Sequence, residues 1–316
     1  MPWLKGSIRF NLALGLPALV LALLVALVVG FASEDFLRPG NLGNLVNRIV
    51  PLGLVALGEA IVLFAGRIDL SVGSVMSLGT AIMATASAGL GWLAIPLALA
   101  AGLSCGLATA AGVVFLRVNP LIMTLATSAI VKGLTLLLLP SPGGEVDYLF
   151  YEAFFGMDEP LGLPLYLILA VFLLAFVVLG WSRFGRSLYA VGSDERSAYA
   201  NGVPIARVDF VVFGLSGLLA AAAGVIMSIR ILSGDPLVGD PYTLDAIAAA
   251  VLGGVALQGG RGNVLGVLVA VVALVLISNA FNLMEINTNV QAIAKGLIFV
   301  LALVFFMRGK AGAVAP

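Results

Sequence analysis

The sequence predicts an all-α integral membrane protein with about ten transmembrane helices, one of them a candidate half-helix. Of its 316 residues, 61% are hydrophobic and only 10% are charged, and the mean hydropathy is +1.16. Soluble domains carry about 25% charged residues, so this composition excludes an ordinary soluble fold. Apolar segments of about 20 residues, the length that crosses a bilayer as a helix, recur along the chain between short polar breaks.

Apolar runs of the required length place the predicted helices near 12–31, 45–66, 70–89, 92–116, 120–139, 161–181, 208–230, 243–258, 263–283 and 289–307. The first run is longer than the apolar region of a signal peptide, about 7 to 15 residues, so we expect it to be a retained helix. The eighth run is short and ends in GGVALQGGRGN, which favours a half-helix or a re-entrant segment. We therefore expect residues 1–316 to form one transmembrane domain.

Basic residues set the expected orientation, because they favour the cytoplasmic side of a membrane. With the N-terminus inside, the cytoplasmic breaks hold Lys5, Arg9, Arg67, Arg117, Arg183, Arg186, Arg196, Arg207, Arg261, Arg308 and Lys310. The inverted topology would place most of the positive charge outside. We therefore expect both termini in the cytoplasm, the break at 140–160 outside and the break at 181–207 inside.

Charge and composition also exclude several function classes. Lys+Arg and Asp+Glu each number 16, so no net charge points to nucleic acid. The single cysteine, Cys105, excludes a disulfide framework and a CxxC site. Histidine is absent, which removes the commonest general base and metal ligand. We expect no catalytic residue, no metal site and no cofactor bound by this chain.

The stretch FAGRIDLSVGSVMSLG places Arg67, Asp69 and Ser71 between two apolar segments. One interpretation is a capped cytoplasmic turn in which both charges reach water or each other. Asp69 would then cap the helix that starts near Leu70 and meet the positive end of the helix dipole. The alternative is that the carboxylate pairs with Arg67 or with a partner subunit and belongs to the moving machinery.

Two further breaks carry recognisable motifs. In the segment near 182–207, SDERSAYANG predicts a short helix with Ser193 as N-cap and Gly202 at its end. Such a helix either lies on the lipid surface or docks onto a soluble partner, and the residues leave both open. Gly254 and Gly259 have the spacing of a phosphate-binding loop, but the lysine and hydroxyl of that motif are missing. This stretch predicts a tight cytoplasmic turn.

Polar residues within the predicted helices are candidates for a substrate path, because ionisable groups in a membrane usually face a bundle interior or a wet cavity. The polar residues are Asn47, Glu59, Lys132, Asp245, Asn279, Asn282, Gln291 and Lys295. Lys295 lies near a helix end, where its side chain can reach the membrane surface. The candidate path residues are therefore Asn47, Glu59, Lys132, Asn279 and Asn282.

Taken together, four blocks resemble the permease subunit of bacterial ATP-driven monosaccharide importers of the ribose-permease type. They are GRIDLSVGS at 66–74, VNPLIMTLATSAIVKGL at 118–134, FGRSLYAVGSDERSAYANGV at 184–203 and LDAIAAAVLGGVALQGGRGNVLG at 244–266. The resemblance implies a multi-pass protein of the bacterial inner membrane that pairs with a second permease copy or a close relative. It also implies two cytoplasmic ATPase domains and a periplasmic sugar-binding protein as partners.

The resemblance further implies that the 184–203 block contains the segment that couples to the ATPase. The implied coupling residues are Gly192, Ser193, Asp194, Glu195, Arg196 and Tyr199. The chain departs from the family pattern at Arg67, where a glycine is usual, and this weakens an assignment to ribose itself.

Two other function classes fit the sequence less well. A secondary transporter or channel for a small polar solute would need coupling-ion residues near the membrane centre and often shows related halves, and neither is evident in the sequence. An intramembrane enzyme would have to rely on carboxylates, and no close pair of acidic residues lies within a predicted helix.

Overall fold

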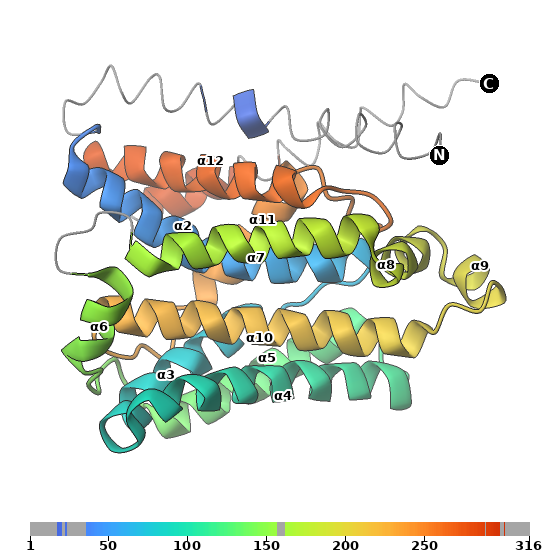
Figure 1. The fold of residues 1–316 in the computed structure, drawn as a ribbon, viewed down its shortest axis with the longest axis horizontal. Coiled ribbons are helices and arrows are strands. Elements are labelled where there is room, and N and C mark those ends of the chain that lie inside the picture. Colours follow the sequence, from blue (N-terminus) through green and yellow to red (C-terminus); the bar gives the residue numbers. More distant parts are fainter. Residues whose placement is uncertain are drawn as a thin grey trace.

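The computed structural model describes residues 18–20, 23, 36–156, 162–287, 289–297 and 300. The predicted helix at 12–31 and both termini lie wholly or largely outside this part of the chain, and the predicted helix at 289–307 lies only partly within it. The elements are α2 (Pro39–Phe64), α3 (Val72–Leu90), the short 3-10 turn η1 (Gly91–Leu93), α4 (Ala94–Phe115), α5 (Pro120–Leu138), α6 (Tyr148–Phe155), α7 (Gly162–Trp181), α8 (Arg183–Ser193), α9 (Glu195–Ala200), α10 (Ile205–Ile231), α11 (Asp240–Leu252) and α12 (Val264–Leu283) (Figure 1). In these residues the only β-type pairing is an isolated bridge between Gly143 and Gly234.

Local sequence explains where several helices begin. The side chain of Asn119 accepts a hydrogen bond from the Leu121 N–H, and Pro120 occupies the first turn of α5, where its missing N–H is no loss. The side chain of Asn263 caps α12 in the same way, through the N–H of Leu265. These starts lie close to the predicted ones because a cap precedes each apolar run.

Six helical stretches of the described chain are long and apolar enough to cross a membrane. One of them, Val72–Phe115, comprises α3, η1 and α4, which pack against each other as a hairpin. The structure is thus a multi-pass, all-α membrane protein. Helix α11 has 13 residues, a length of about 20 Å, and so falls short of the bilayer core of about 30 Å.

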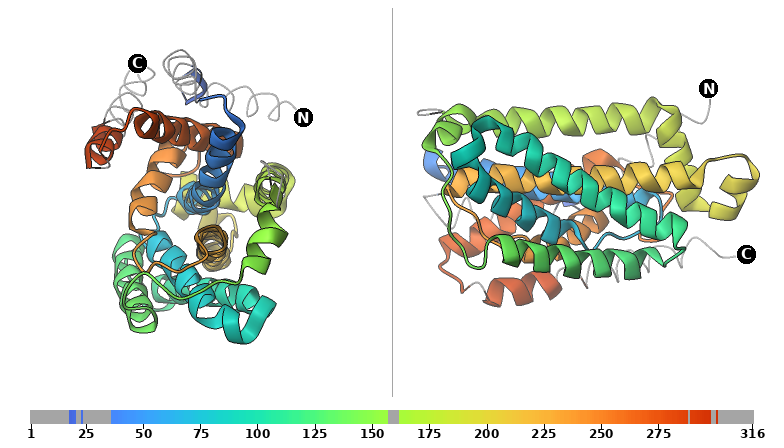
Figure 2. Two further views of the ribbon diagram at one scale, coloured as in Figure 1. Left: turned by 90° about the vertical axis from the view of Figure 1, so that its left-hand side faces the viewer. Right: turned by 90° about the horizontal axis from the view of Figure 1, so that it is seen from below.

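Helix α10 forms the centre of the bundle and packs on α2, α3 and α4 (Figure 2). The backbones come close because small residues meet: a Cβ at Gly106 would collide with the carbonyl of Phe213, and one at Gly102 with that of Gly217. Gly102 and Gly106 belong to a ridge of small residues on α4, which is typical of helices packed in membranes.

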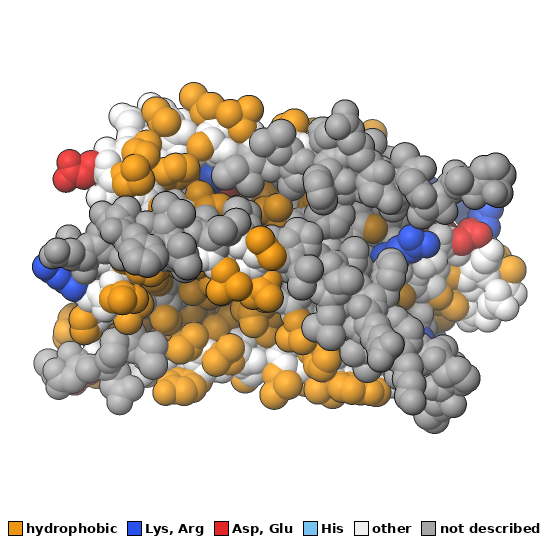
Figure 3. Space-filling model, turned by 90° about the horizontal axis from the view of Figure 1, so that it is seen from above, with side chains coloured by type: hydrophobic (Ala, Val, Ile, Leu, Met, Phe, Trp, Pro, Cys, Tyr) orange, Lys and Arg blue, Asp and Glu red, His pale blue; other side chains and the backbone are white. Residues whose placement is uncertain are grey.

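The outer surface is apolar along the helices and charged towards the ends. In Figure 3, the described side chains in the middle of the visible face are mostly hydrophobic, and most described charged side chains lie near the two ends of the long axis. Exposed hydrophobic residues on α5 and α7 include Leu125, Ile130, Leu173 and Leu174. Helix α6 lies at one end and α8 and α9 at the other, and we call these the α6 end and the α9 end (Figure 1).

Two connections run back into the bundle. After α2, residues 65–71 return along its last turns, so that the Asp69 N–H donates to Glu59 Oε1 at 3.3 Å. After α10, residues 232–239 descend along α3 until the Gly239 N–H donates to Ser77 Oγ at 3.0 Å. Helices α3 and α11 therefore both begin partway along the length of the bundle. The expectation that the break after α2 leaves both of its charges at a surface is wrong.

Candidate functional site

Three sequence motifs that lie far apart in the chain meet at the α9 end. The Gly260 N–H donates to the Phe64 carbonyl at 3.0 Å, which joins the end of α2 to the loop after α11. A Cβ at Gly192, near the end of α8, would collide with both of these backbone atoms. A Cβ at Gly259 would press on the backbone of Gly66. We call the four glycines Gly66, Gly192, Gly259 and Gly260 the glycine junction.

Backbone conformation at the glycine junction also requires glycine. Gly66, Gly259 and Gly260 have φ of 74°, 85° and 70°. Residues with a Cβ rarely adopt these values, because the side chain meets the neighbouring carbonyl oxygen. The loop at 253–263 is thus the tight turn that the sequence predicts, held against α2 and α8.

Arg67 makes a second link at the same end. Its Nε lies 3.3 Å from Asp209 Oδ1 on α10, and a terminal nitrogen lies 2.9 Å from Glu195 Oε2 on α9. The Arg67 and Asp209 side chains are nearly buried, whereas Glu195 is half exposed. Burial alone lowers the pKa of the guanidinium, but the charges of Asp209 and Glu195 outweigh it and raise that pKa. Arg67 stays charged and ties α9 to α10.

Asp69 is buried apart from Arg67. Its Oδ1 accepts hydrogen bonds from the Ser71 N–H at 2.9 Å and the Ser71 hydroxyl at 2.6 Å, and its Oδ2 accepts one from the Ser216 hydroxyl at 2.8 Å. Burial raises the pKa of this carboxyl, and the hydrogen bonds from Ser71 and Ser216 oppose that shift. Asp69 therefore holds the turn before α3 and fastens it to α10. Arg67 and Asp69 do not form an ion pair with each other.

The predicted short helix at SDERSAYANG exists as α9, but its N-cap differs from the prediction. Asp194, not Ser193, accepts from the N–H groups of Arg196 at 3.0 Å and Ser197 at 3.4 Å. Ser193 ends α8 instead, and its hydroxyl donates to the Tyr189 carbonyl. Both residue types cap helices, and the extended backbone falls at Asp194. The Ser197 hydroxyl, at 2.6 Å, lowers the pKa of Asp194.

Helix α9 projects beyond the ends of the long helices (Figure 1). Tyr199 on α9 is 74% exposed, which is high for an aromatic side chain. Glu195 and Arg196 are exposed beside it. A large exposed aromatic ring flanked by charges is a composition that suits contact with another protein. Gly202, with φ of 79°, follows the helix as expected.

The structure does not bring the five candidate path residues together. Glu59 is fully buried in α2, and its Oε2 has no hydrogen-bond partner. Asn279 exchanges hydrogen bonds with Asn41, and Asn282 accepts one from Gln291.

The remaining two candidates, Asn47 and Lys132, make different types of contact. The Asn47 carbonyl accepts a hydrogen bond from Arg230 at 3.3 Å. Only Lys132 carries a charge that is partly exposed along the flank of a long helix, where it pairs with Asp240 at 2.5 Å.

Comparison with known proteins decides the family. A family model described as "Branched-chain amino acid transport system / permease component" matches residues 41–303. The chain belongs to this permease family. It is 36% identical to the ribose import permease protein of Bacillus subtilis (strain 168) over 293 residues, which cover 90% of each chain.

Two arabinose permeases are similar as well. The L-arabinose transport system permease protein of Escherichia coli (strain K12) is 35% identical over 84% of this chain and 82% of its own. The L-arabinose ABC transporter permease protein of Azospirillum brasilense is 33% identical over 86% and 81%. The chain is thus a transport subunit of the permease type.

Sequence reasoning missed three polar residues of this permease that make tertiary contacts: Asp209, Ser216 and Asp240. Asp245 was named among the polar residues of the predicted helices but not among the candidate path residues, and it pairs with Lys295. Asp209 and Ser216 lie in the apolar α10, so their presence there could have indicated side chains that face the interior of the bundle. Their partners are far away in sequence and were not predictable from spacing.

Proposed function

We propose that this chain is the membrane-spanning permease subunit of an ATP-driven importer for a monosaccharide, in the inner membrane of a bacterium. The observation that carries the proposal is the similarity along nearly the whole chain to permeases named for ribose and arabinose import. A periplasmic binding protein delivers the sugar, and ATP is hydrolysed on separate subunits. Two copies of the permease, or this chain and a close relative, form the path.

In this proposal α8 and α9 form the coupling segment that seats in the ATPase. Gly192 and Ser193 end α8, and Asp194, Glu195, Arg196 and Tyr199 belong to the cap and body of α9, which projects from the α9 end (Figure 1). Movement of this segment reaches the bundle by two rigid contacts. The ion pairs of Arg67 transmit movement of α9 to α10. The glycine junction transmits movement of α8 to the end of α2 and to the loop after α11.

The proposed orientation places the α9 end and both termini in the cytoplasm, with about ten crossings in all. In a Cys105→Ala background, a cysteine introduced at the exposed Ser193 is expected to react with an impermeant thiol reagent only from the cytoplasmic side. A cysteine at the exposed Ser141, which precedes α6, is expected to react only from outside. Labelling of both positions from one side contradicts this topology.

Tyr199 is the proposed aromatic anchor for the ATPase. Tyr199→Ala is expected to weaken association of the permease with the ATPase by about 2 kcal/mol, because buried aromatic anchors dominate such interfaces. Binding is measured between purified permease in detergent and the ATPase subunit. Leu116→Ala is the matched control, because Leu116 is 73% exposed but lies outside α8 and α9. Equal affinities for the two variants would show that Tyr199 is not an anchor.

Arg67 tests the link between coupling segment and bundle. Arg67→Gln is expected to cost about 2 kcal/mol of stability, because it leaves the nearly buried Asp209 without its counter-charge; half-exposed Glu195 adds little. ATP-driven uptake should fall more than the amount of assembled complex. Adding Asp209→Asn removes the unpaired charge and should restore stability without restoring uptake. Full recovery of uptake in the double variant would mean that the link is structural only.

The family description names branched-chain amino acids, which makes a neutral amino acid the second candidate substrate. The decisive experiment reconstitutes the permease with its ATPase and binding protein in vesicles. Uptake of ribose, arabinose and leucine is then compared with ATP present or absent. ATP-dependent uptake of a sugar supports the proposal. Uptake that follows an ion gradient without ATP would favour a secondary transporter or channel instead.

A further inference from the structure

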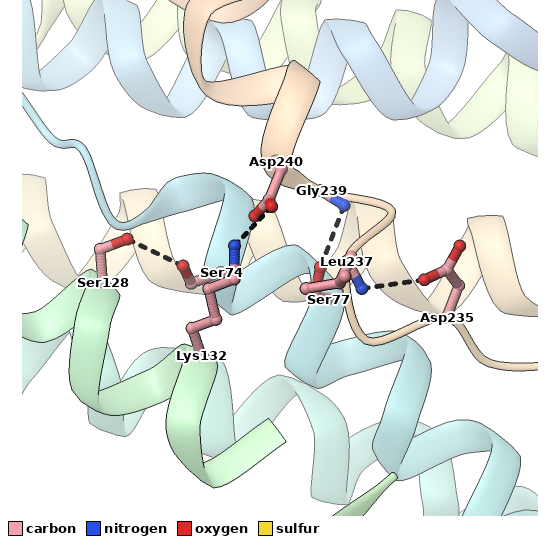
Figure 4. Close-up of polar contacts among 8 residues, drawn as sticks. All are labelled: Ser74, Ser77, Ser128, Lys132, Asp235, Leu237, Gly239 and Asp240. Atoms are coloured by element: carbon pink, nitrogen blue, oxygen red, sulfur yellow. Dashed lines mark hydrogen bonds and ion pairs between the residues drawn. The ribbon is translucent and has the colours of Figure 1, made fainter. Parts of the chain in front are cut away.

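Two ion pairs lie on the short helix α11, one on each side. Asp240, at its start, pairs with Lys132 on α5 (Figure 4), and Asp245, one turn later, pairs at 2.8 Å with Lys295 in the segment 289–297. The first pair is the more open, with side chains 39% and 44% exposed; those of Lys295 and Asp245 are 25% and 22% exposed. We call the surface around the first pair, Lys132 and Asp240, the α5–α11 face.

The Lys132–Asp240 pair lies deep along the bundle. Lys132 is about 18 Å along α5 from its start at Pro120. Asp240 follows Gly239, whose N–H donates to Ser77 in the second turn of α3 (Figure 4). Helix α3 continues for about 20 Å beyond Ser77 to Leu90. Helix α5 ends about 9 Å beyond Lys132, at Leu138, so the pair lies partway along the bundle, away from both of its ends.

Lipid is an unsuitable neighbour for this face. Charged groups within a membrane face a bundle interior or a water-filled cavity, because acyl chains cannot solvate them. Yet in the single chain the pair stands open, and Leu244, one turn along α11 from Asp240, is an exposed apolar residue. The irregular segment 232–239 leads into the same face, and irregular backbone at membrane depth occurs only where protein or water covers it. The face thus requires water or a second copy.

The chemistry of the face suits a neutral polar solute. The Lys132 ammonium donates hydrogen bonds, the Asp240 carboxylate accepts them, and their charges cancel. One turn along α5, Ser128 shares a 2.8 Å hydrogen bond with Ser74 of α3, which adds hydroxyl groups beside the pair (Figure 4). Transport sites commonly lie where a discontinuous helix begins inside the membrane, as α11 does.

We propose that the α5–α11 face lines the water-filled path of the importer, at the seam with the second copy, and that Lys132 and Asp240 hydrogen-bond the hydroxyl groups of the passing sugar. This inference rests on the proposed function. It narrows the five candidate path residues to Lys132 and adds Asp240, whereas Asn279 and Glu59 have their contacts inside the bundle.

Water access is tested by cysteine labelling of the complete importer in vesicles. In a Cys105→Ala background, Lys132→Cys and Asp240→Cys are treated with a charged, impermeant methanethiosulfonate. Leu173→Cys, in the middle of α7 and 63% exposed, is the control for a lipid-facing position. Both test positions are expected to react roughly tenfold or more faster than the control, because the thiolate that reacts forms in water. Rates equal to the control would overturn the path assignment.

Sugar contact is tested by uptake. The double variant Lys132→Met/Asp240→Leu removes the pair without leaving a lone charge, and sugar uptake per assembled complex should fall about tenfold or more. The neutral polar variant Lys132→Gln/Asp240→Asn, for use if the apolar one does not assemble, should raise the KM for loaded binding protein or lower the maximal rate by a similar factor. Uptake equal to the unchanged permease in an assembled variant would overturn the sugar contact.

The two proposals fail in different ways. Labelling needs neither ATP nor sugar, so an unlabelled face in a permease that imports sugar overturns only the path assignment. Fast labelling in a permease that imports leucine but no sugar overturns the proposed substrate class and leaves the wet path in place.

Discussion

Gly192→Ala is expected to destabilise the permease by about 3 kcal/mol or more, because the new Cβ would overlap the backbone of two neighbouring segments. It would press on the Phe64 carbonyl and the Gly260 N–H, which are hydrogen-bonded to each other. Both are backbone atoms, so relief requires α8 to move away from α2 and the loop after α11. The measurement is reversible unfolding in mixed detergent micelles, together with co-purification of the ATPase.

Gly180→Ala is the control for this experiment. Gly180 also lies near the end of a helix, in α7, but a Cβ there meets nothing within 4 Å. Alanine favours a helix over glycine by about 0.5 to 1 kcal/mol, so this variant should be as stable as the unchanged permease or slightly more stable. If Gly192→Ala unfolds like Gly180→Ala, the glycine junction is looser than its geometry indicates.

Asp69→Ala is the second substitution with a large expected effect. It removes the acceptor for three hydrogen bonds in a site that is 1% exposed, which leaves the donors of Ser71 and Ser216 unsatisfied. Each unsatisfied buried donor costs about 1 to 3 kcal/mol, and hydroxyl rotation recovers part of the loss, so we expect about 3 to 5 kcal/mol in total. Unfolding of the variant in detergent measures the stability, and ATP-driven uptake measures the function.

Asp69→Asn separates the two interpretations of this residue. The asparagine oxygen can accept both hydrogen bonds from Ser71, and its amide can donate to the Ser216 hydroxyl, which then rotates. The ion pairs of Arg67 would be unchanged, because its partners are Asp209 and Glu195. We therefore expect Asp69→Asn to retain most of the uptake. An asparagine variant as inactive as the alanine variant would show that the negative charge itself is needed.

The helices were predictable where apolar runs are long. Helices α3, α4, α5, α7, α10 and α12 lie within a few residues of their predicted positions. Helix α2 begins earlier than predicted, at Pro39, because its first six residues, PGNLGN, contain Asn41, Asn44 and two glycines and do not look apolar. Helix α6 was missed because its eight residues interrupt a polar break. Hydropathy reports burial in lipid, and these parts of the chain depend on tertiary contacts instead.

The site was predictable in pieces but not as a whole. The motifs at 66–74, 184–203 and 244–266 stand out in the sequence, yet nothing in their spacing shows that Gly66, Gly192 and Gly259 meet. The depth of Asp69 was misjudged for a related reason. A break between two apolar runs predicts a surface turn, whereas residues 65–71 turn back inside the bundle, where Ser216 satisfies the carboxylate.

The order of the two ion pairs along the chain has a consequence for biogenesis. Ribosomes make the chain from its N-terminus, so Lys132 already exists when Asp240 is made, 108 residues later. The order is reversed for Asp245, because its partner Lys295 is made 50 residues after it. During synthesis, the counter-charge of Asp240 is therefore already present, whereas Asp245 stays unpaired until the segment 289–297 has been made. The segment 289–297 therefore brings the charge that completes the neutralisation of α11.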